Sequence, residues 1–209
     1  MLGEHYYDTS AIKELVEALA PEFTGRVRAL RHPAIEIKHA RLENLPKRRE
    51  RLQAVIAVER VKHKIHCVFA HEDCDAVEPA HEGLSRLIEK TFQSLDSPVY
   101  AVTPAWEIEA WWFQWPHAVH AVNSSWRIPD DYVGQSVGHM RDAKEQLQRA
   151  VVPKTLSKTE KRGFRTYQAF DSPAVAKSIR ERGEAATPQA MSGSYCWFVR
   201  RVQQCQAAV

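Results

Sequence analysis

The sequence lacks the short motifs that assign a chain to several large enzyme classes. It contains no Gly-rich phosphate loop, no G-x-S-x-G turn and no H-E-x-x-H helix, and only 8 of its 209 residues are glycine. These absences set aside P-loop nucleotide hydrolases and α/β-hydrolases.

Long apolar runs are also missing. None approaches the ~20 residues that a membrane-spanning helix needs. The first residues, MLGEHYYD, lack the basic and apolar regions of a signal peptide. We therefore expect a soluble, cytoplasmic protein with no membrane among its partners.

Cysteines are few, and they do not occur in closely spaced pairs. The four cysteines, Cys67, Cys74, Cys196 and Cys205, form no C-x-x-C pair. Zinc ligands normally occur in close pairs, and a disulfide framework requires a secretory route. We expect four reduced thiols and no structural zinc.

What the chain does contain is typical of a globular protein. Hydrophobic residues make up 44% and charged residues 26%, which excludes intrinsic disorder. Its length suits one domain, or one domain with a small appendage. The net charge of +3 permits an anionic partner without requiring one.

Helical and strand periodicities alternate along the first part of the chain. Such alternation is typical of an α/β sandwich with a mostly parallel sheet flanked by helices. The patterns predict helices over 9–20, 45–62 and around 84–92, a half-exposed strand over 33–38, and buried strands over 65–70 and 98–103.

The character of the chain changes after residue 122. We predict an α/β domain over 1–122 and a helical C-terminal extension over 123–209 that packs on it. The extension is expected to hold helices over 136–150, from Ser172 to near Gly183 and over 193–204, with a basic loop over 153–165.

Carboxylates follow the ends of the predicted strands. Asp73 and Asp75, with Glu72 beside them, follow the strand over 65–70, and Glu107 and Glu109 follow the strand over 98–103. The carboxyl ends of parallel strands meet at one edge of a sheet, where ligands bind. Residues i and i+2 of an extended segment face the same way, so Asp73 and Asp75 can share one cation. Carboxylate oxygens suit Mg²⁺ or Mn²⁺. The alternative for any single cluster is a helix cap or solvated loop charge.

The order of these acids resembles the TOPRIM fold. More narrowly, it resembles a bacterial TOPRIM-like family of unknown function that is linked to phage abortive infection and related to OLD-type TOPRIM nucleases. The resemblance is carried by FAHEDCD at 69–75, EIEAWW at 107–112 and SGSYCWFVRRV at 192–202, with Glu4 as the first acid. EIEAW is its sharpest element.

The resemblance implies metal-dependent cleavage of phosphodiesters. In it, Asp73 and Asp75 hold Mg²⁺, and Glu4 is a further ligand or a general base. Only Met1, Leu2 and Gly3 precede Glu4, and His5 stands where the family has glycine.

The expected function is therefore a Mg²⁺- or Mn²⁺-dependent nuclease in anti-phage defence. The alternatives are a non-catalytic subunit of a defence or toxin complex that binds nucleic acid or a partner, and a phosphatase-like enzyme for a small nucleotide.

The two glutamates of EIEAW compete for the metal. If 107–115 is helical, Glu107 and Glu109 lie on opposite sides of its buried stripe, so both can face one cation only if Glu107 is still extended. We favour Glu109, which gives the catalytic set Glu4, Asp73, Asp75 and Glu109. Further candidates are Glu72, Glu107 and His71.

Basic residues gather in two stretches, 47–64 and 153–165. Such stretches are usually solvated faces, but beside an acidic metal site they favour contact with DNA or RNA. The residues expected to make this contact are Lys154, Lys158, Lys161, Arg162 and Arg165. An ATPase or another defence-system subunit is a further candidate partner.

Overall fold

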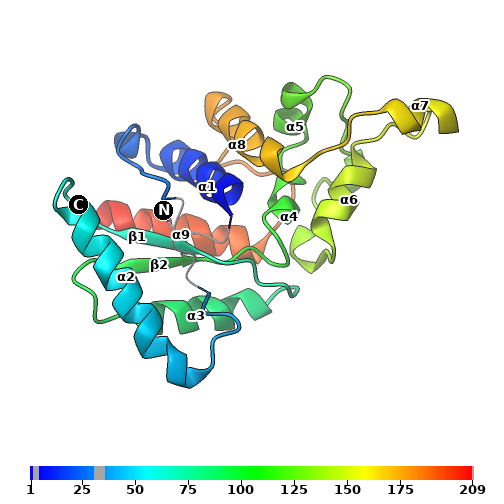
Figure 1. Cartoon of the computed structure of the whole chain (residues 1–209). Helices are drawn as coiled ribbons and strands as arrows, with labels where there is room; N and C mark the ends of the chain where they lie inside the picture. The colour runs from blue at the N-terminus through cyan, green and yellow to red at the C-terminus, as the bar shows by residue number, and fades with distance from the viewer. Residues whose placement is uncertain (2–4, 31–35, 209) are drawn as a thin grey trace.

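The computed structural model describes residues 1, 5–30 and 36–208, without the side chains of Lys158 and Lys161 (Figure 1). Over these residues the chain is α/β, with a small parallel sheet among helices. No described helix is both long enough and apolar enough to cross a membrane.

Two short strands form the sheet of the described chain. Strand β1 (Val68–His71) pairs in parallel with β2 (Val99–Val102), and the register places Val68 opposite Val99. Both buried strands were predicted from their apolar runs, and both are confirmed. The strand predicted over 33–38 is not: residues 36–38 are irregular, and 33–35 lie outside the described residues. The sheet is therefore smaller than expected, and the TOPRIM-like fold remains a prediction.

Alternate residues of the strands face two different helical layers. Val68, Ala70 and Ala101 pack in one hydrophobic cluster with α2 (Leu45–Arg60) and α3 (Ala80–Phe92). Phe69 and Val102 belong to a larger cluster with α9 (Gly193–Ala207) and α1 (Tyr6–Leu19). Strands with apolar residues on both faces are stable only when both faces are covered, and here they are.

Most of the remaining helices extend this larger cluster on one side of the sheet (Figure 1). Helix α8 (Ser172–Glu181) packs against α1 and against α5 (Pro116–Val122). The indole rings of the EIEAWW segment are buried there, as expected for core residues. The other helices are α4 (Glu109–Trp112), α6 (Ala143–Ala150) and α7 (Lys158–Gly163), and the short 3-10 turns are Pro21–Phe23, Leu42–Asn44, Asp130–Tyr132, Val137–His139 and Ala169–Asp171.

The segment 153–165, predicted as a basic loop, contains α7. Figure 1 shows α7 projecting from the body at the tip of the excursion between α6 and α8. No residue of α7 belongs to the described hydrophobic clusters. The segment therefore has no apolar stripe from which a helix could be predicted.

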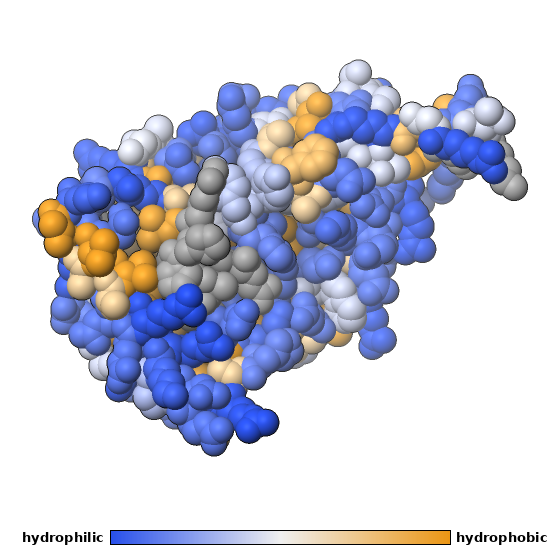
Figure 2. All heavy atoms as spheres, viewed as in Figure 1, coloured by the Kyte–Doolittle hydropathy of each residue, from blue (hydrophilic) through white to orange (hydrophobic). Residues whose placement is uncertain are grey.

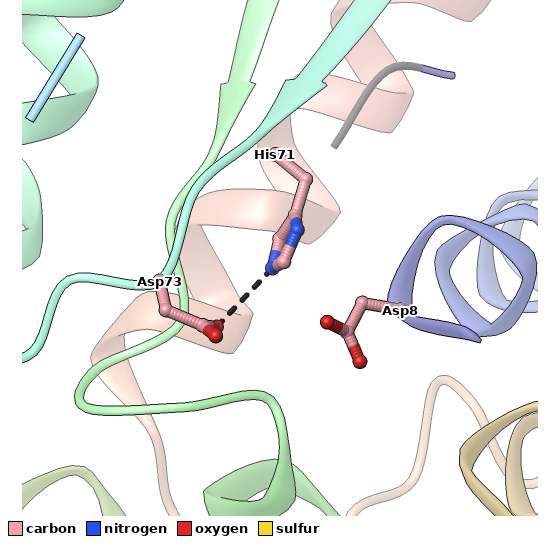
Figure 3. Close-up of side chains that lie close together, drawn as sticks. All are labelled: Asp8, His71 and Asp73. Carbon is pink, nitrogen blue, oxygen red and sulfur yellow. Dashed lines mark ion pairs between the residues drawn. The ribbon is translucent and has the colours of Figure 1, made fainter. Parts of the chain in front are cut away.

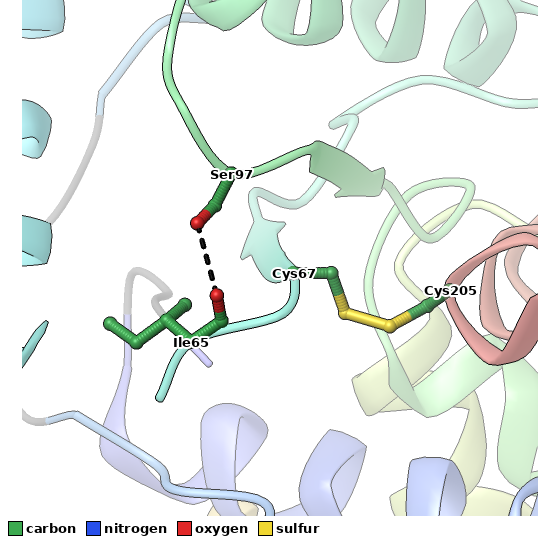
Figure 4. Close-up of a disulfide and its surroundings, with 4 residues drawn as sticks. All are labelled: Ile65, Cys67, Ser97 and Cys205. Carbon is green, nitrogen blue, oxygen red and sulfur yellow. Dashed lines mark hydrogen bonds between the residues drawn. A yellow bond between two sulfur atoms is a disulfide. The ribbon is translucent and has the colours of Figure 1, made fainter. Parts of the chain in front are cut away.

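Two cysteines are joined. Cys67, just before β1, forms a disulfide with Cys205 near the end of α9, at a sequence separation of 138 (Figure 4). The hydroxyl of Ser97 donates to the carbonyl of Ile65 beside it. Cys74 and Cys196 are free. The prediction of four reduced thiols is therefore wrong for this pair, and the cytoplasmic location that it supported stays a prediction.

Candidate functional site

Three side chains from two distant parts of the chain meet beyond the carboxyl end of β1. The donor atoms of Asp8, His71 and Asp73 all lie within 4.8 Å of one another. Figure 3 shows Asp8 reaching in from α1 and the other two from the end of β1. The imidazole Nε2 of His71 lies 3.3 Å from Oδ1 of Asp73. Groups of this type can hold a divalent cation.

Local structure explains why these side chains point inward. His71 is the last residue of β1 and faces the same way as Phe69, two residues earlier, toward α1 and α9. Asp8 lies in the first turn of α1, one turn before the buried Ile12. It therefore continues the apolar stripe of α1 as a buried carboxylate.

Glu109 is a fourth titratable side chain close to Asp8 and Asp73. Its side chain is only 4% exposed. Burial, followed by the nearby charges of Asp8, Asp73 and Glu107, raises the pKa of Glu109 to about 8. The acid therefore carries a proton at neutral pH when no cation is present.

A tyrosine network fixes the position of Glu109. The hydroxyl of Tyr167 donates to Oε1 of Glu109 at 3.3 Å and lies 2.6 Å from the hydroxyl of Ser172. Burial and the neighbouring Glu109 raise the pKa of Tyr167 well above its usual value, so this hydroxyl keeps its proton. Trp112 Nε1 donates to both hydroxyl oxygens.

Glu107 precedes helix α4 and is half-buried. Its Oε2 accepts the backbone N–H of Lys144 at the start of α6. Burial and the charge of Asp73 raise the pKa of Glu107, although the bond from Lys144 works against this shift. Because the helix begins only at Glu109, both glutamates lie within the electrostatic reach of Asp73, and the choice between them as ligand stays open.

Asp75 and Glu72 lie away from the group of three. Asp75 has a φ of 51°, so the segment is not extended there, and its side chain is 55% exposed with Oδ2 at 2.5 Å from Lys38 Nζ. The expectation that Asp73 and Asp75 face the same way is therefore wrong. Glu72 is buried and accepts the backbone N–H groups of Ile37 and Lys38. Glu4 lies outside the described residues.

The C-terminal motif around 192–194 supports the EIEAWW segment. Ser194 Oγ accepts hydrogen bonds from Trp111 Nε1 at 3.0 Å and from the backbone N–H of Ala105 at 3.1 Å. Ser192 Oγ and the N–H of Ser194 both donate to Glu78 Oε1. Burial alone would raise the pKa of Glu78, but these bonds at the start of α9 outweigh it and lower the pKa.

Sequence patterns did not single out Asp8 or Glu78. They offered Tyr167 as a hydrogen-bond donor to phosphate, but its side chain is buried beside Glu109. A signal for Asp8 was present, because it lies one residue before the predicted helix over 9–20, at i−4 and i−7 from the buried Ile12 and Leu15. Glu78 and Tyr167 sit in irregular segments, where no periodicity marks a buried side chain.

The predicted nucleic-acid-binding residues divide into two kinds. Lys154 and Arg162 are exposed. Arg165 binds Asp171 at 2.5 Å and lies over the Trp126 ring at 5.1 Å, so part of its role is structural. The side chains of Lys158 and Lys161 are not among the described ones.

A separate cavity lies at the opposite end of the sheet. It has a volume of about 660 Å³ and is lined by the disulfide cysteines, Arg28 and Lys62, among others. Figure 2 shows apolar side chains at this end of the molecule, where α2 ends and Val61 is exposed. Because this cavity opens at the amino end of β1, it does not lead to the acidic group.

Comparison of the chain with protein-family models, with curated proteins and with solved structures finds no match in any of the three. What the site can do is therefore inferred from its own geometry.

Proposed function

We propose that this chain is a metal-dependent phosphodiester-cleaving protein of nuclease type. The observation that carries the proposal is the meeting of Asp8, His71 and Asp73 within 4.8 Å, beside the buried Glu109. A role in bacterial anti-phage defence is part of the proposal and is supported by the resemblance of EIEAWW and its neighbouring motifs to the TOPRIM-like family.

The donor set fits a divalent cation. Two carboxylates and one imidazole offer mixed oxygen and nitrogen ligands. Mg²⁺ favours oxygen ligands, and Mn²⁺ also binds carboxylates. Because the set includes an imidazole nitrogen, which Mn²⁺ accepts more readily than Mg²⁺ does, the donor types favour Mn²⁺ of the two expected ions.

Each residue then has a role that follows from its surroundings. Asp8, His71 and Asp73 would hold the cation. A bound cation would neutralise phosphate charge and lower the pKa of an attacking water. Glu109 holds a proton on a carboxyl group whose pKa is close to neutrality, which suits a general acid or base, and the Tyr167 hydroxyl orients that carboxyl group.

One observation favours a second candidate, a non-catalytic subunit that binds nucleic acid or a protein partner. Asp8, His71 and Glu109 are each at most 5% exposed. A substrate phosphate reaches such groups only where Asp73 and Glu107, which are less buried, leave an opening. A subunit that only binds would have no need of such an opening.

The test is cleavage of labelled DNA and RNA, single-stranded and duplex, with Mn²⁺, with Mg²⁺ and with EDTA. We expect cleavage with Mn²⁺ that EDTA abolishes and that Asp73→Asn lowers at least about 100-fold, because the variant loses an anionic ligand. Asp96→Asn is the matched control, since Asp96 is an exposed partner of Arg60. Inactivity of the wild type on every substrate, or equal rates for Asp73→Asn and wild type, would remove the nuclease proposal and leave the binding subunit.

A further inference from the structure

Three aromatic side chains form an exposed patch next to the acidic group. Tyr6, Tyr7 and Phe170 are 45%, 44% and 52% exposed. The ring of Tyr7 lies 6.0 Å from that of Tyr6 and 6.5 Å, edge-on, from that of Phe170. We name these three residues the aromatic platform. Figure 2 shows hydrophobic side chains over the start of α8, with hydrophilic side chains around them.

The aromatic platform is built by the same segments that supply the acidic group. Tyr7 directly precedes Asp8 in the first turn of α1. Phe170 follows Tyr167, the tyrosine that donates to Glu109, by three positions. Since α1 and α8 pack together, the platform is held beside the candidate cation ligands. A chain lying on the platform therefore crosses the segments that carry Asp8 and Tyr167.

Positive charge borders the aromatic platform. The guanidinium carbon of Arg165 lies 5.8 Å from the Phe170 ring, and this side chain pairs with Asp171 while it stays 49% exposed. Helix α7, which precedes Arg165 in the chain, also carries the exposed Arg162. Aromatic faces with flanking arginine are the elements that bind unpaired nucleobases and the phosphates between them.

We propose that the aromatic platform binds single-stranded nucleic acid, with unpaired bases stacked on Tyr7 and Phe170 and with phosphates near Arg165. A duplex cannot bind in this way, because its bases already stack on one another. The inference deepens the proposed function by naming its substrate class and rests on that function only for the cleavage. The binding itself requires no cation.

Binding is measured on the full chain in EDTA, by fluorescence anisotropy with fluorescein-labelled oligothymidylate of about twelve nucleotides. Two further probes carry the same phosphates: a strand of abasic units and a duplex. We expect the oligothymidylate to bind at least about tenfold more tightly than either, because only it offers free bases for stacking.

Variants locate the binding surface. Tyr7→Ala and Phe170→Ala should each weaken binding of oligothymidylate about tenfold, which corresponds to ~1.4 kcal/mol. Tyr7→Phe and Phe170→Tyr should retain it, since they keep a ring. Met191→Ala, at a residue 62% exposed and outside the platform, is the matched control and should change nothing. A thermal unfolding scan of each variant confirms that it is folded.

The outcomes separate this inference from the proposed function. Equal affinity for abasic and thymidylate strands, unchanged binding in both alanine variants, or no binding at all would overturn the platform. The inference would also be overturned if Tyr7→Ala abolished binding of a protein partner but left oligonucleotide binding unchanged. Base-dependent binding without Mn²⁺-dependent cleavage would support the platform while the nuclease proposal fails. Mn²⁺-dependent cleavage that is unaltered in Tyr7→Ala and Phe170→Ala would support the nuclease proposal, while the platform fails.

Discussion

At the residue scale, Glu109 shows most clearly how burial and neighbouring charges change the pKa of a side chain. Burial and the neighbouring acids raise its pKa in the folded chain to about 8, whereas an unfolded glutamate titrates near 4.5. Between these two values the folded chain holds a proton that the unfolded chain has lost. The free energy of unfolding therefore falls as pH rises through this window, by about 1.4 kcal/mol per pH unit for one proton.

We predict that Glu109→Gln flattens this dependence. In wild type, the free energy of unfolding should fall between about pH 5 and pH 8, and the variant should lose less over the same range because glutamine binds no proton. Urea denaturation at several pH values, in EDTA, measures both slopes. Glu43→Gln, at an exposed glutamate, should keep the wild-type slope. Identical slopes for Glu109→Gln and wild type would show that Glu109 is already ionised in the folded chain.

Single residues also show where pattern-based prediction succeeded. Asp73 could be placed near the sheet edge because it follows an apolar strand, and it lies there. Asp75 could not be placed correctly, because its φ of 51° turns the chain after Asp73 and no spacing rule anticipates that turn. Asp8, which no pattern singled out, lies beside the end of β1. Glu4 lies outside the described residues, so its expected role stays a prediction.

At the scale of elements, α9 depends on one carboxylate at its start. Glu78 accepts hydrogen bonds from Ser192, Ser194 and the backbone of Gly193, and Ser194 in turn holds Trp111. Gly138 leaves room for this carboxylate: a Cβ on Gly138 would lie 1.9 Å from Cδ of Glu78. Position 138 must therefore be glycine while Glu78 stays where it is.

We predict that Gly138→Ala lowers the free energy of unfolding by about 2 to 4 kcal/mol, because Glu78 must leave its hydrogen-bond donors. Gly163→Ala is the matched control: no described atom lies within 4 Å of a Cβ at this position, and alanine is the better helix former, so stability should hold or rise slightly. Urea denaturation measures both. A Gly138→Ala protein as stable as wild type would show that Glu78 does not anchor α9.

Elements with a core-facing periodicity were predictable, and elements without one were not. The helices over 9–20 and 193–204 correspond to α1 and α9 because each buries an apolar stripe. Alternation over 33–38 suggested a strand, yet the backbone N–H groups of Ile37 and Lys38 bind the buried carboxylate of Glu72, and residues 36–38 pair with no described strand. Alternation alone does not show whether a neighbouring strand is available.

At the scale of the whole molecule, distant segments close on one another. The core that holds β1 and β2 also takes in α8 and α9 from the C-terminal third. The bond between Cys67 and Cys205 joins the start of β1 to the end of that third. Such a pairing depends on which segments become neighbours in space, so the spacing of the cysteines could not predict it.

The same closure assembles the acidic group, since α1 brings Asp8 to the end of β1. The central claim is that Asp8 and Asp73 bind one divalent cation together, and titration of Mn²⁺ into the chain by isothermal calorimetry tests it most directly. We predict one Mn²⁺ per wild-type chain, binding weakened at least about tenfold in Asp8→Asn and in Asp73→Asn, and wild-type affinity in Asp75→Asn, whose side chain pairs with Lys38. No Mn²⁺ binding by wild type, or a loss in Asp75→Asn with none in Asp8→Asn, would contradict the claim.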